Sequence, residues 1–264
     1  MEDAERGQVV AEAAVVYDEF FVPALFGQWP GHVLDRASVA EGHDVLDVGC
    51  GTGVLARAAA GRVGTSGTVT GVDPNPGMLS VARRSAEPVE WVDGAAEDLP
   101  FDDAAFDRIV SQFALMFFDD RSAGLASMAR ALRTGGSIAI ATWSPLDRVP
   151  GYAAMVELLD RMFGSDAALA LAAPFVLGDH AELTELVGDH FERVEIVEQP
   201  GTARFESIEA WMHTDIRGWT LADMIDDEQY GELVAAAERD LARFVGRDGA
   251  VEFDAPAVIT TAIG

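Results

Sequence analysis

The fold is decided by the stretch Asp47-Val48-Gly49-Cys50-Gly51-Thr52-Gly53. This glycine-rich loop follows an apolar run that begins at Val45, and it precedes alanine-rich residues 53–61 with a helical pattern. A strand, a glycine loop and a helix in this order are the context in which such a loop binds a ligand. Glycines let that ligand approach the backbone without a clash at Cβ. The stretch therefore predicts a ligand site at the carboxyl end of a strand in an α/β sheet.

The spacing of the loop argues against a site for a nucleotide phosphate. A P-loop requires Gly-Lys-Ser/Thr, and all 18 basic residues of this chain are arginine. The dinucleotide fingerprint is Gly-x-Gly-x-x-Gly, whereas the spacing here is Gly-x-Gly-x-Gly, with Asp47 two residues before the first glycine. A carboxylate aimed into the loop repels a pyrophosphate and suits a positively charged group, such as the ammonium of an amino acid.

A second acid stands at the end of the next predicted strand. Asp73 lies 20 residues after Gly53 and closes the β-branched run at residues 68–72. An acid at this place accepts hydrogen bonds from both hydroxyls of a ribose. One acid for an ammonium and another for a ribose fit a nucleoside joined to an amino acid, and S-adenosylmethionine is such a molecule.

Short apolar runs alternate with amphipathic stretches as far as residue 143. They predict strands near residues 45–48, 68–72, 89–92, 106–110 and 137–143, and helices near 53–61, 76–84 and 121–133. The last of these helices is expected to stop at Thr134-Gly135-Gly136. Strands separated by helices of this length indicate βαβ units and a parallel sheet.

The C-terminal part predicts further strands near residues 191–197 and 256–262, with helices near 151–164, 179–188, 206–217 and 228–245. These helices exceed what strand crossovers require, so they build a lid or pocket, or add a packing layer. The expected fold is α/β: a Rossmann-like, seven-stranded, mostly parallel sheet flanked by helices, with helical cap insertions near the C-terminus. We expect N-terminal lid helices at 1–40, a cofactor-binding core at 41–150, and the cap with the last two strands at 151–264.

The charge of the chain narrows its range of partners. The 264 residues include 45 acidic and 18 basic side chains, a formal net charge of −27, and 49% are hydrophobic. So negative a surface repels phosphate backbones and anionic lipid headgroups, so neither a nucleic acid nor a membrane is an expected partner. The acid excess fits a protein that works in molar salt. A GC-rich coding sequence explains the missing lysine but not the excess of acids.

The single cysteine, the first residues and the lengths of the apolar runs indicate the cellular compartment in which the protein is expected. The lone cysteine, Cys50, excludes an intrachain disulfide and a multi-cysteine metal site, and no metal site is expected. The acidic first residues are the reverse of a secretory signal, and no apolar run approaches the roughly 20 residues of a membrane span. The expected location is the cytoplasm, and the sequence leaves the oligomeric state open.

Five motifs together resemble class I S-adenosylmethionine-dependent methyltransferases, in the branch that includes the ubiquinone and menaquinone biosynthesis C-methyltransferases. The motifs are Val45–Gly53, Gly71–Leu79, Gly94–Phe101, Phe106–Gln112 and Ala131–Gly136. The resemblance implies S-adenosyl-L-methionine as cofactor and in-line transfer of its methyl group to a small-molecule acceptor.

The resemblance also assigns cofactor contacts. The expected cofactor-binding residues are Tyr17, Asp47, Gly49, Cys50, Gly51, Gly53, Asp73, Pro74, Met78, Ala95, Ala96, Glu97, Ser111 and Gln112. The glycines would pack against the methionine part, which Ser111 and Gln112 would face, and Pro74 and Met78 would lie beside the adenine. Tyr17 resembles a lid residue that closes over the cofactor.

Two of these positions depart from a simple assignment. Ala95 stands where the family usually places an acid against the adenine amino group. That hydrogen bond is therefore either missing or supplied by the backbone of Ala96 or Glu97 or by the side chain of Asp93 or Glu97. Cys50 stands where the family often has cysteine, and we expect it to pack as a small residue rather than to act as a nucleophile.

The cap supplies the candidates for acceptor chemistry. The predicted helix at Glu209–Trp219 carries His213 and Arg217 four residues apart. His213 is the candidate general base and Arg217 the candidate clamp for a substrate carboxylate. The alternative is that His213 is solvated and that Arg217 pairs with one of the many acids. The candidates for an apolar wall beside the transferred methyl group, or for core, are Phe113, Met116, Phe117 and Phe118.

Two other functions fit parts of the pattern. A protein that binds S-adenosylmethionine without catalysis would keep the loop and both acids. A nucleotide-dependent oxidoreductase would share the sheet but fits the loop poorly. Methyl transfer from a sulfonium requires alignment and exclusion of water, and a general base only where the nucleophile must lose a proton. We therefore expect an S-adenosylmethionine-dependent methyltransferase.

Overall fold

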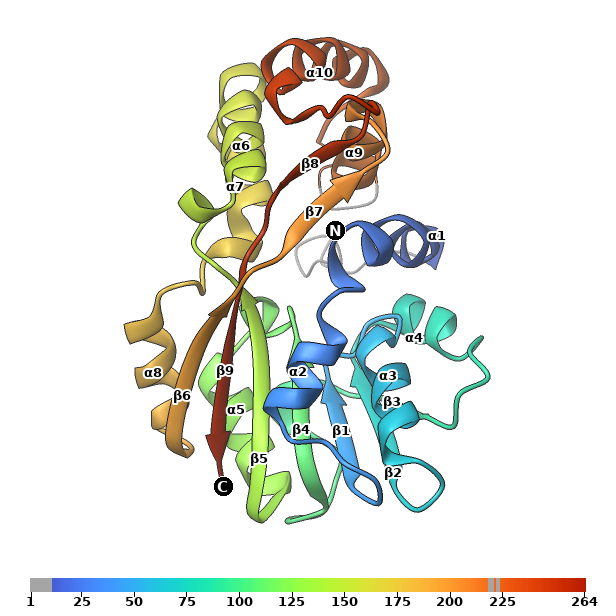
Figure 1. Ribbon diagram of the computed structural model, residues 1–264, viewed down its shortest axis with the longest axis vertical. Helices are drawn as coiled ribbons and strands as arrows, with labels where there is room; N and C mark the ends of the chain where they lie inside the picture. The colour runs from blue at the N-terminus through green and yellow to red at the C-terminus, as the bar shows by residue number, and fades with distance from the viewer. Residues whose placement is uncertain (1–10, 218–220, 222–223) are drawn as a thin grey trace.

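The computed structural model describes residues 11–217, 221 and 224–264, and the first part of that range alternates strands with helices (Figure 1). The strands are β1 (Asp44–Val48), β2 (Thr68–Asp73), β3 (Glu90–Asp93), β4 (Phe106–Gln112) and β5 (Leu132–Trp143). The α-helices are α1 (Ala11–Val16), α2 (Pro30–Arg36), α3 (Val54–Val63), α4 (Pro76–Ala82) and α5 (Arg121–Ala131). Shorter elements are the π-helix η2 (Tyr17–Phe26) and the 3-10 turns η3 (Ala96–Asp98), η4 (Leu115–Phe117) and η5 (Leu146–Arg148).

The second part is mainly helical. Its helices are α6 (Pro150–Phe163), α7 (Ser165–Ala172), α8 (His180–Gly188), α9 (Ile208–Met212) and α10 (Asp227–Asp240), with η6 (Ala173–Phe175), the π-helix η7 (His213–Arg217) and η9 (Ala242–Phe244). Its strands are β6 (Glu192–Gln199), β7 (Thr202–Phe205), β8 (Val251–Asp254) and β9 (Ala257–Ile263). The helix predicted at 206–217 is thus α9 continued by a π-helical turn.

The central sheet has seven strands in the order β3-β2-β1-β4-β5-β9-β6, which confirms the predicted fold class. The strands from β3 to β5 are parallel, and β9 runs antiparallel to both of its neighbours. Helices α2 and α3 cover one face of the sheet and α5 the other (Figure 1). The strand order reverses at β1, between β2 and β4, and ligands of open α/β sheets bind beside such a switch point.

The junction between α5 and β5 differs from the prediction. The helix ends at Ala131, because Leu132 is already extended and pairs with Phe106 of β4. Gly135, with φ of 76°, instead bends β5 near its start, and its N–H donates to the carbonyl of Gly264. The predicted glycine stop is therefore a bend inside a strand.

Two strands that were not predicted, β7 and β8, form a separate two-stranded sheet. They pair in the same register as β6 and β9, and in that register Pro200 stands opposite Pro256. Proline has no N–H, so neither residue of this pair can donate to the ladder. The ladder is interrupted there, and the β7–β8 arm rises from the sheet into the cap (Figure 1).

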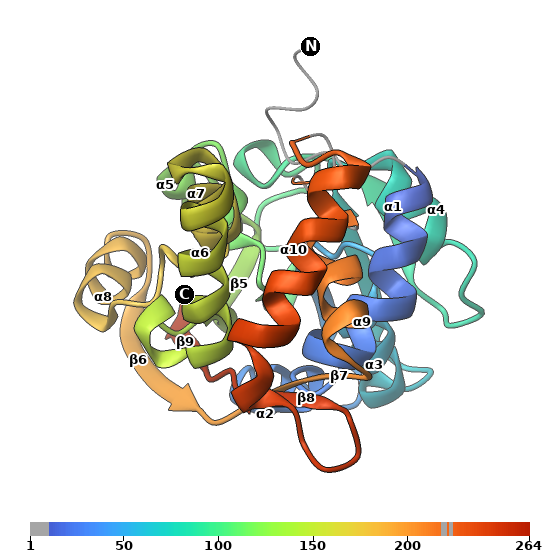
Figure 2. The ribbon, with the colours of Figure 1, turned by 90° about the horizontal axis from the view of Figure 1, so that it is seen from above.

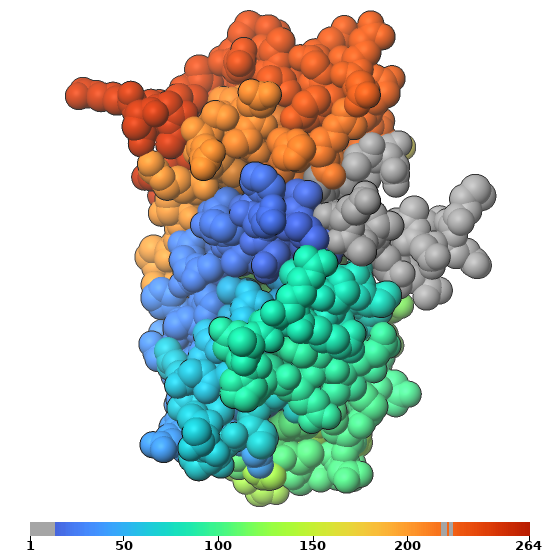
Figure 3. All heavy atoms as spheres, turned by 90° about the vertical axis from the view of Figure 1, so that its right-hand side faces the viewer, coloured from blue at the N-terminus to red at the C-terminus, as the bar shows by residue number. Residues whose placement is uncertain are grey.

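The cap, made of α6, α7, α9, η7 and α10 around the β7–β8 arm, has an aromatic core of its own. The ring of Trp211 lies 4.8 Å from that of Phe253 and 5.6 Å from that of Phe205. Seen from above, α10 crosses the cap between α6 and α9 (Figure 2). The segment from α1 to η2 lies between the cap and the core (Figure 3). No helix among the described residues is long and apolar enough to cross a membrane.

Candidate functional site

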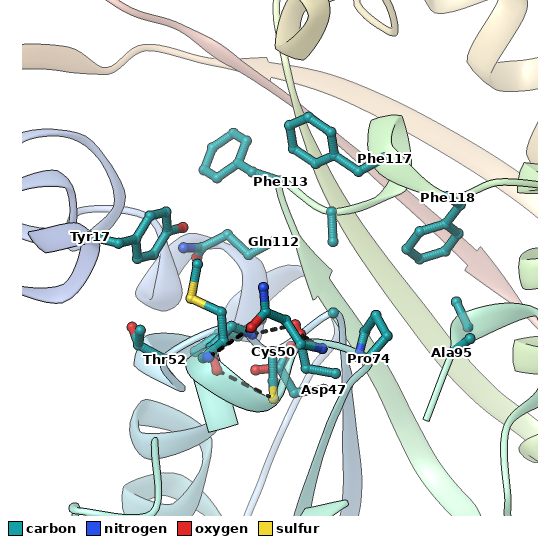
Figure 4. Close-up of a pocket in the computed structure, with 18 of the residues that line it drawn as sticks. Tyr17, Asp47, Cys50, Thr52, Pro74, Ala95, Gln112, Phe113, Phe117 and Phe118 are labelled. Atoms are coloured by element: carbon teal, nitrogen blue, oxygen red, sulfur yellow. Dashed lines mark hydrogen bonds between the residues drawn. The ribbon is translucent and has the colours of Figure 1, made fainter. Parts of the chain in front are cut away.

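A cavity of about 500 Å³ lies where β1, β2 and β4 end, beneath the cap (Figure 4). This volume falls within the range of about 300–1,000 Å³ that is typical of small-molecule sites. Most of the predicted cofactor residues line it, namely Tyr17, Asp47, Gly49, Cys50, Gly51, Asp73, Pro74, Met78, Ala95, Ala96, Glu97 and Gln112. The structure thus brings together segments that lie far apart in the chain.

Asp73 is held rigidly at the end of β2. Its Oδ2 accepts a hydrogen bond from the N–H of Gly51 and its Oδ1 from the N–H of Asn75, both at 2.8 Å. Burial raises the pKa of Asp73, and the two amides oppose that rise. A carboxylate has about four lone-pair sites, so both oxygens keep capacity for ligand hydroxyls.

Asn75 was missed by the sequence analysis, although its position carries a signal. Its Oδ1 accepts from the N–H groups of Gly77 and Met78 and so caps α4, which has Pro76 at its first position. Asparagine followed by proline is a common helix start. Asn75 therefore fixes both the carboxylate of Asp73 and the helix that carries Met78.

Asp47 is held differently at the end of β1. It is 1% exposed, and neither of its oxygens has a hydrogen-bond partner among the described residues. Burial raises the pKa of Asp47 to about 8, the nearby amide of Ala56 opposes this without making a hydrogen bond of normal geometry, and the charge of Asp73 adds to it. Both oxygens therefore keep capacity for a ligand donor, and a cation beside them would return Asp47 to its ionised form.

The three loop glycines have positive φ but different surroundings. A Cβ on Gly49 would lie 2.4 Å from the Cβ of Ala114, and one on Gly53 would lie 2.3 Å from the ring of Trp91. A Cβ on Gly51 would meet no atom within 4 Å. Gly49 and Gly53 are therefore required by packing inside the protein, whereas Gly51 leaves open space on the ligand side.

Two predicted contacts lie outside the lining of the cavity. Gly53 packs against Trp91, and the hydroxyl of Ser111, which is fully buried, donates to the carbonyl of Val48 at 2.8 Å. Thr52, which the sequence analysis did not single out, does line the cavity, and its buried Oγ1 has no partner among the described residues.

Aromatic side chains form the wall opposite the loop (Figure 4). The ring of Tyr17 stacks on that of Phe26, with centroids 5.1 Å apart. Burial and then the negative charge of Asp73 raise the pKa of the Tyr17 hydroxyl, which therefore stays protonated. Nε2 of Gln112 donates to the carbonyl of Phe26 at 3.3 Å, while its buried Oε1 has no partner among the described residues.

Comparison with known proteins agrees with this geometry. Residues 45–136, from β1 into β5, match the model of the methyltransferase domain family. This segment, about a third of the chain, is similar to methyltransferase domains. A ubiquinone/menaquinone biosynthesis C-methyltransferase of Idiomarina loihiensis is 35% identical over 147 residues, which cover 53% of this chain and 59% of that protein. The chain spans about half the length of the curated relatives that it matches.

Solved structures share the fold over a longer stretch. The YcgJ protein of Bacillus subtilis superposes with a TM-score of 0.60 at 20% identity, covering 89% of this chain and 97% of that one. A phosphoethanolamine N-methyltransferase of Haemonchus contortus, in complex with S-adenosyl-L-methionine, gives 0.63 at 18% identity, covering 99% of this chain and 59% of that one. These structures share the fold, while the match at residues 45–136 and the curated relative confirm the resemblance to class I methyltransferases.

The two candidate catalytic residues do not line the cavity of the methyltransferase domain. His213 is exposed, with its ring 5.9 Å from that of Phe20. Nη2 of Arg217 lies 2.5 Å from Oδ1 of Asp227, and its guanidinium lies 4.6 Å above the ring of Tyr230. Arg217 thus pairs with an acid of the cap, Asp227, as expected if it is not a clamp for the substrate. Trp219 lies outside the described residues.

Proposed function

We propose that this protein transfers a methyl group from S-adenosyl-L-methionine to a small-molecule acceptor. The observation that carries the proposal is the pair of buried acids, Asp47 and Asp73, at the ends of neighbouring strands in one cavity. An ammonium beside Asp47 and a ribose beside Asp73 satisfy both carboxylates with one ligand. The methyltransferase domain at residues 45–136 supports the same cofactor.

The residues present fit this cofactor. Four buried side-chain oxygens that have no partner among the described residues belong to residues that line the cavity: Oδ1 and Oδ2 of Asp47, Oγ1 of Thr52 and Oε1 of Gln112. Buried polar atoms are normally hydrogen-bonded, so four in one place indicate a polar ligand. The open space at Gly51 leaves room for that ligand against the backbone.

The chain contributes mainly alignment and exclusion of water. When bound, S-adenosyl-L-methionine supplies an electrophilic methyl group that needs no further activation. Asp47 would hold the ammonium, and Asp73, fixed by Gly51 and Asn75, would hold the ribose, so that the cofactor has one orientation. Tyr17, from a segment that lies between the core and the cap, would cover the ligand and keep water out.

Calorimetric titration followed by an acceptor screen tests the proposal. We expect the protein to bind both S-adenosyl-L-methionine and S-adenosylhomocysteine, and then to transfer a deuterated methyl group to a compound in a metabolite extract, detected as a mass shift. Quinone-type acceptors, which the name of the curated relative suggests, form one arm of the screen. Cofactor binding without any labelled product would favour a non-catalytic binding protein. Binding of NADH but not of S-adenosyl-L-methionine would favour an oxidoreductase.

A further inference from the structure

A second, smaller cavity of about 60 Å³ adjoins the first beneath the cap. Tyr17, Phe113 and Phe117 line both, so a molecule in the smaller space lies directly beside the cofactor cavity. Phe117 is 46% exposed, which is unusual for a phenylalanine that lines two cavities. An exposed apolar ring that lines a cavity suits contact with an apolar molecule. We call the smaller space the aromatic chamber, lined among others by Tyr17, Phe26, Phe113, Trp143, Tyr152 and Phe175.

The backbone around the aromatic chamber is unusual at three places. Phe113 has φ of 56°, in the left-handed region that bulky residues rarely adopt, and its ring stacks on that of Trp143 at 3.9 Å. The π-helices η2 and η7 both contribute lining residues, and they pack against each other. In η2, Pro23 lacks an N–H, and the N–H of Gly27 reaches back five residues to Val22. Strained residues and π-helices cluster at functional sites.

One ionisable side chain lies among these rings. Asp215, on η7, lines the aromatic chamber and is 4% exposed. The hydroxyl of Tyr152 donates to its Oδ1 and Oδ2 at 3.1 and 3.2 Å. Burial raises the pKa of Asp215 to about 8, and the Tyr152 hydroxyl and then the nearby Trp211 side chain oppose the rise. Two neutral donors still leave part of the hydrogen-bonding capacity of a carboxylate unused.

The charges around both cavities are of one sign. Among the described residues, those that line the two cavities include Asp47, Asp73 and Asp215 but no arginine and no histidine. An acceptor with a carboxylate or phosphate would be desolvated here without a counter-charge, which is costly. An uncharged planar ring is favoured by the aromatic walls, and a hydroxyl or amine on it would meet Asp215.

We propose that the acceptor is a planar, apolar molecule without a negative charge, which enters the aromatic chamber edge first and donates a hydrogen bond from a hydroxyl or amine to Asp215. The inference rests on the proposed function, because it places this molecule beside the cofactor cavity. Tyr152 then acts as a positioning residue that fixes the carboxylate. A site built around a buried polar group rejects analogues that lack the matching group far more strongly than it rejects analogues of slightly different size.

Four ligands of matched size test the inference on the wild-type protein loaded with S-adenosylhomocysteine. Naphthol and naphthylamine carry a donor, naphthalene carries none, and naphthoate carries a negative charge. We expect naphthol or naphthylamine to bind at least about 10-fold more tightly than naphthalene, the worth of one hydrogen bond, and naphthoate to bind most weakly. The first two ligands distinguish a hydroxyl from an amine. Equal binding of all four, or tightest binding of naphthoate, would overturn the proposal.

Variants assign the discrimination to Asp215. The double variant Tyr152→Phe/Asp215→Leu replaces both partners of a buried hydrogen bond by apolar groups, which need not destabilise the fold. It should bind naphthol and naphthalene equally, whereas Asp227→Asn, an exposed change in the same cap, should keep the wild-type ratio. An unchanged ratio in the double variant would refute the role of Asp215. Because S-adenosylhomocysteine binding is measured first, its absence would count against the proposed function, and the four ligands can still be compared on the protein alone.

Discussion

The glycine loop and the aromatic chamber hold their acids by opposite means. At the sheet edge, Asp73 is fixed by two backbone amides that belong to residues within 22 positions of it. In the cap, Asp215 is fixed by a side chain 63 positions away, inside walls that come from helices and strands across the chain. Backbone amides are retained when side chains are substituted, so the loop suits a cofactor that many proteins share. Walls made of side chains can differ between proteins, so they suit an acceptor that is specific to this protein.

The largest expected effect on the free energy of unfolding comes from adding a side chain to the glycine loop where it packs against the core. Gly53→Ala would place a Cβ 2.3 Å from the ring of Trp91 at φ of 90°. Overpacking and backbone strain should together lower the free energy of unfolding by about 2–5 kcal/mol, measured by urea denaturation.

Gly51→Ala is the matched control for that change. Its Cβ meets nothing within 4 Å, so only the positive φ of 53° opposes the substitution, at a cost of about 1 kcal/mol. The new methyl group would instead project toward the cavity and weaken cofactor binding. Equal destabilisation by both substitutions would show that the loop is not divided into a packing side and a ligand side.

The second prediction concerns cofactor affinity and Asp73, the acid that accepts hydrogen bonds from two backbone amides. Asp73→Ala removes the acceptor for the Gly51 and Asn75 amides and for the proposed ribose. We expect affinity for S-adenosylhomocysteine to fall about 10-fold or more in calorimetry, since a hydrogen bond to a charged group contributes about 1.5–3 kcal/mol. Asp98→Ala, an exposed acid near the same edge, should leave it unchanged. Unchanged affinity in Asp73→Ala would refute the ribose assignment.

The sheet could be predicted from sequence because its signals are local. Each strand from β1 to β5 is a short apolar run, and the loop and Asp73 mark their own positions by glycine, proline and spacing. The cap could be predicted only as extra helices. The β7–β8 arm consists of two four-residue strands separated from the main ladder by Pro200 and Pro256, and the pairing of distant strands is invisible in either one alone.

The candidate site divides in the same way. Most of the expected cofactor residues line the cavity, because they follow from the ends of strands. His213 and Arg217 were chosen for residue type on an expected α-helix, whereas the π-helical turn of η7 buries Asp215 and leaves His213 exposed. A period of 3.6 residues does not reveal such a turn. Asp215 itself looks like one more surface acid until Tyr152 is brought beside it.

A third prediction follows from the unpartnered acid. The folded-state pKa of Asp47, about 8, lies above the usual value of about 3.9 for an unfolded chain. Between these values the folded state binds more protons than the unfolded state, so this group makes the free energy of unfolding fall as pH rises from about 4 to 8. Asp47→Asn should flatten that fall by at least about 1.4 kcal/mol, the equivalent of one pKa unit, in urea titrations at pH 5 and pH 8. A slope identical to that of the wild type would mean that Asp47 is ionised in the empty site.

The smallest effect should come from the surface of the cap. Arg217 pairs with Asp227, which is fully exposed, and such pairs contribute about 1 kcal/mol or less. Arg217→Met keeps an apolar stem over the ring of Tyr230 and should change the free energy of unfolding by no more than that, with Arg239→Met on α10 as the matched surface control. Turnover with the acceptor that the screen identifies distinguishes the two roles of Arg217. A large loss of turnover at unchanged stability would show that the guanidinium of Arg217 contacts the substrate. An acceptor with a carboxylate would then fit the aromatic chamber, contrary to our proposal of an acceptor without a negative charge.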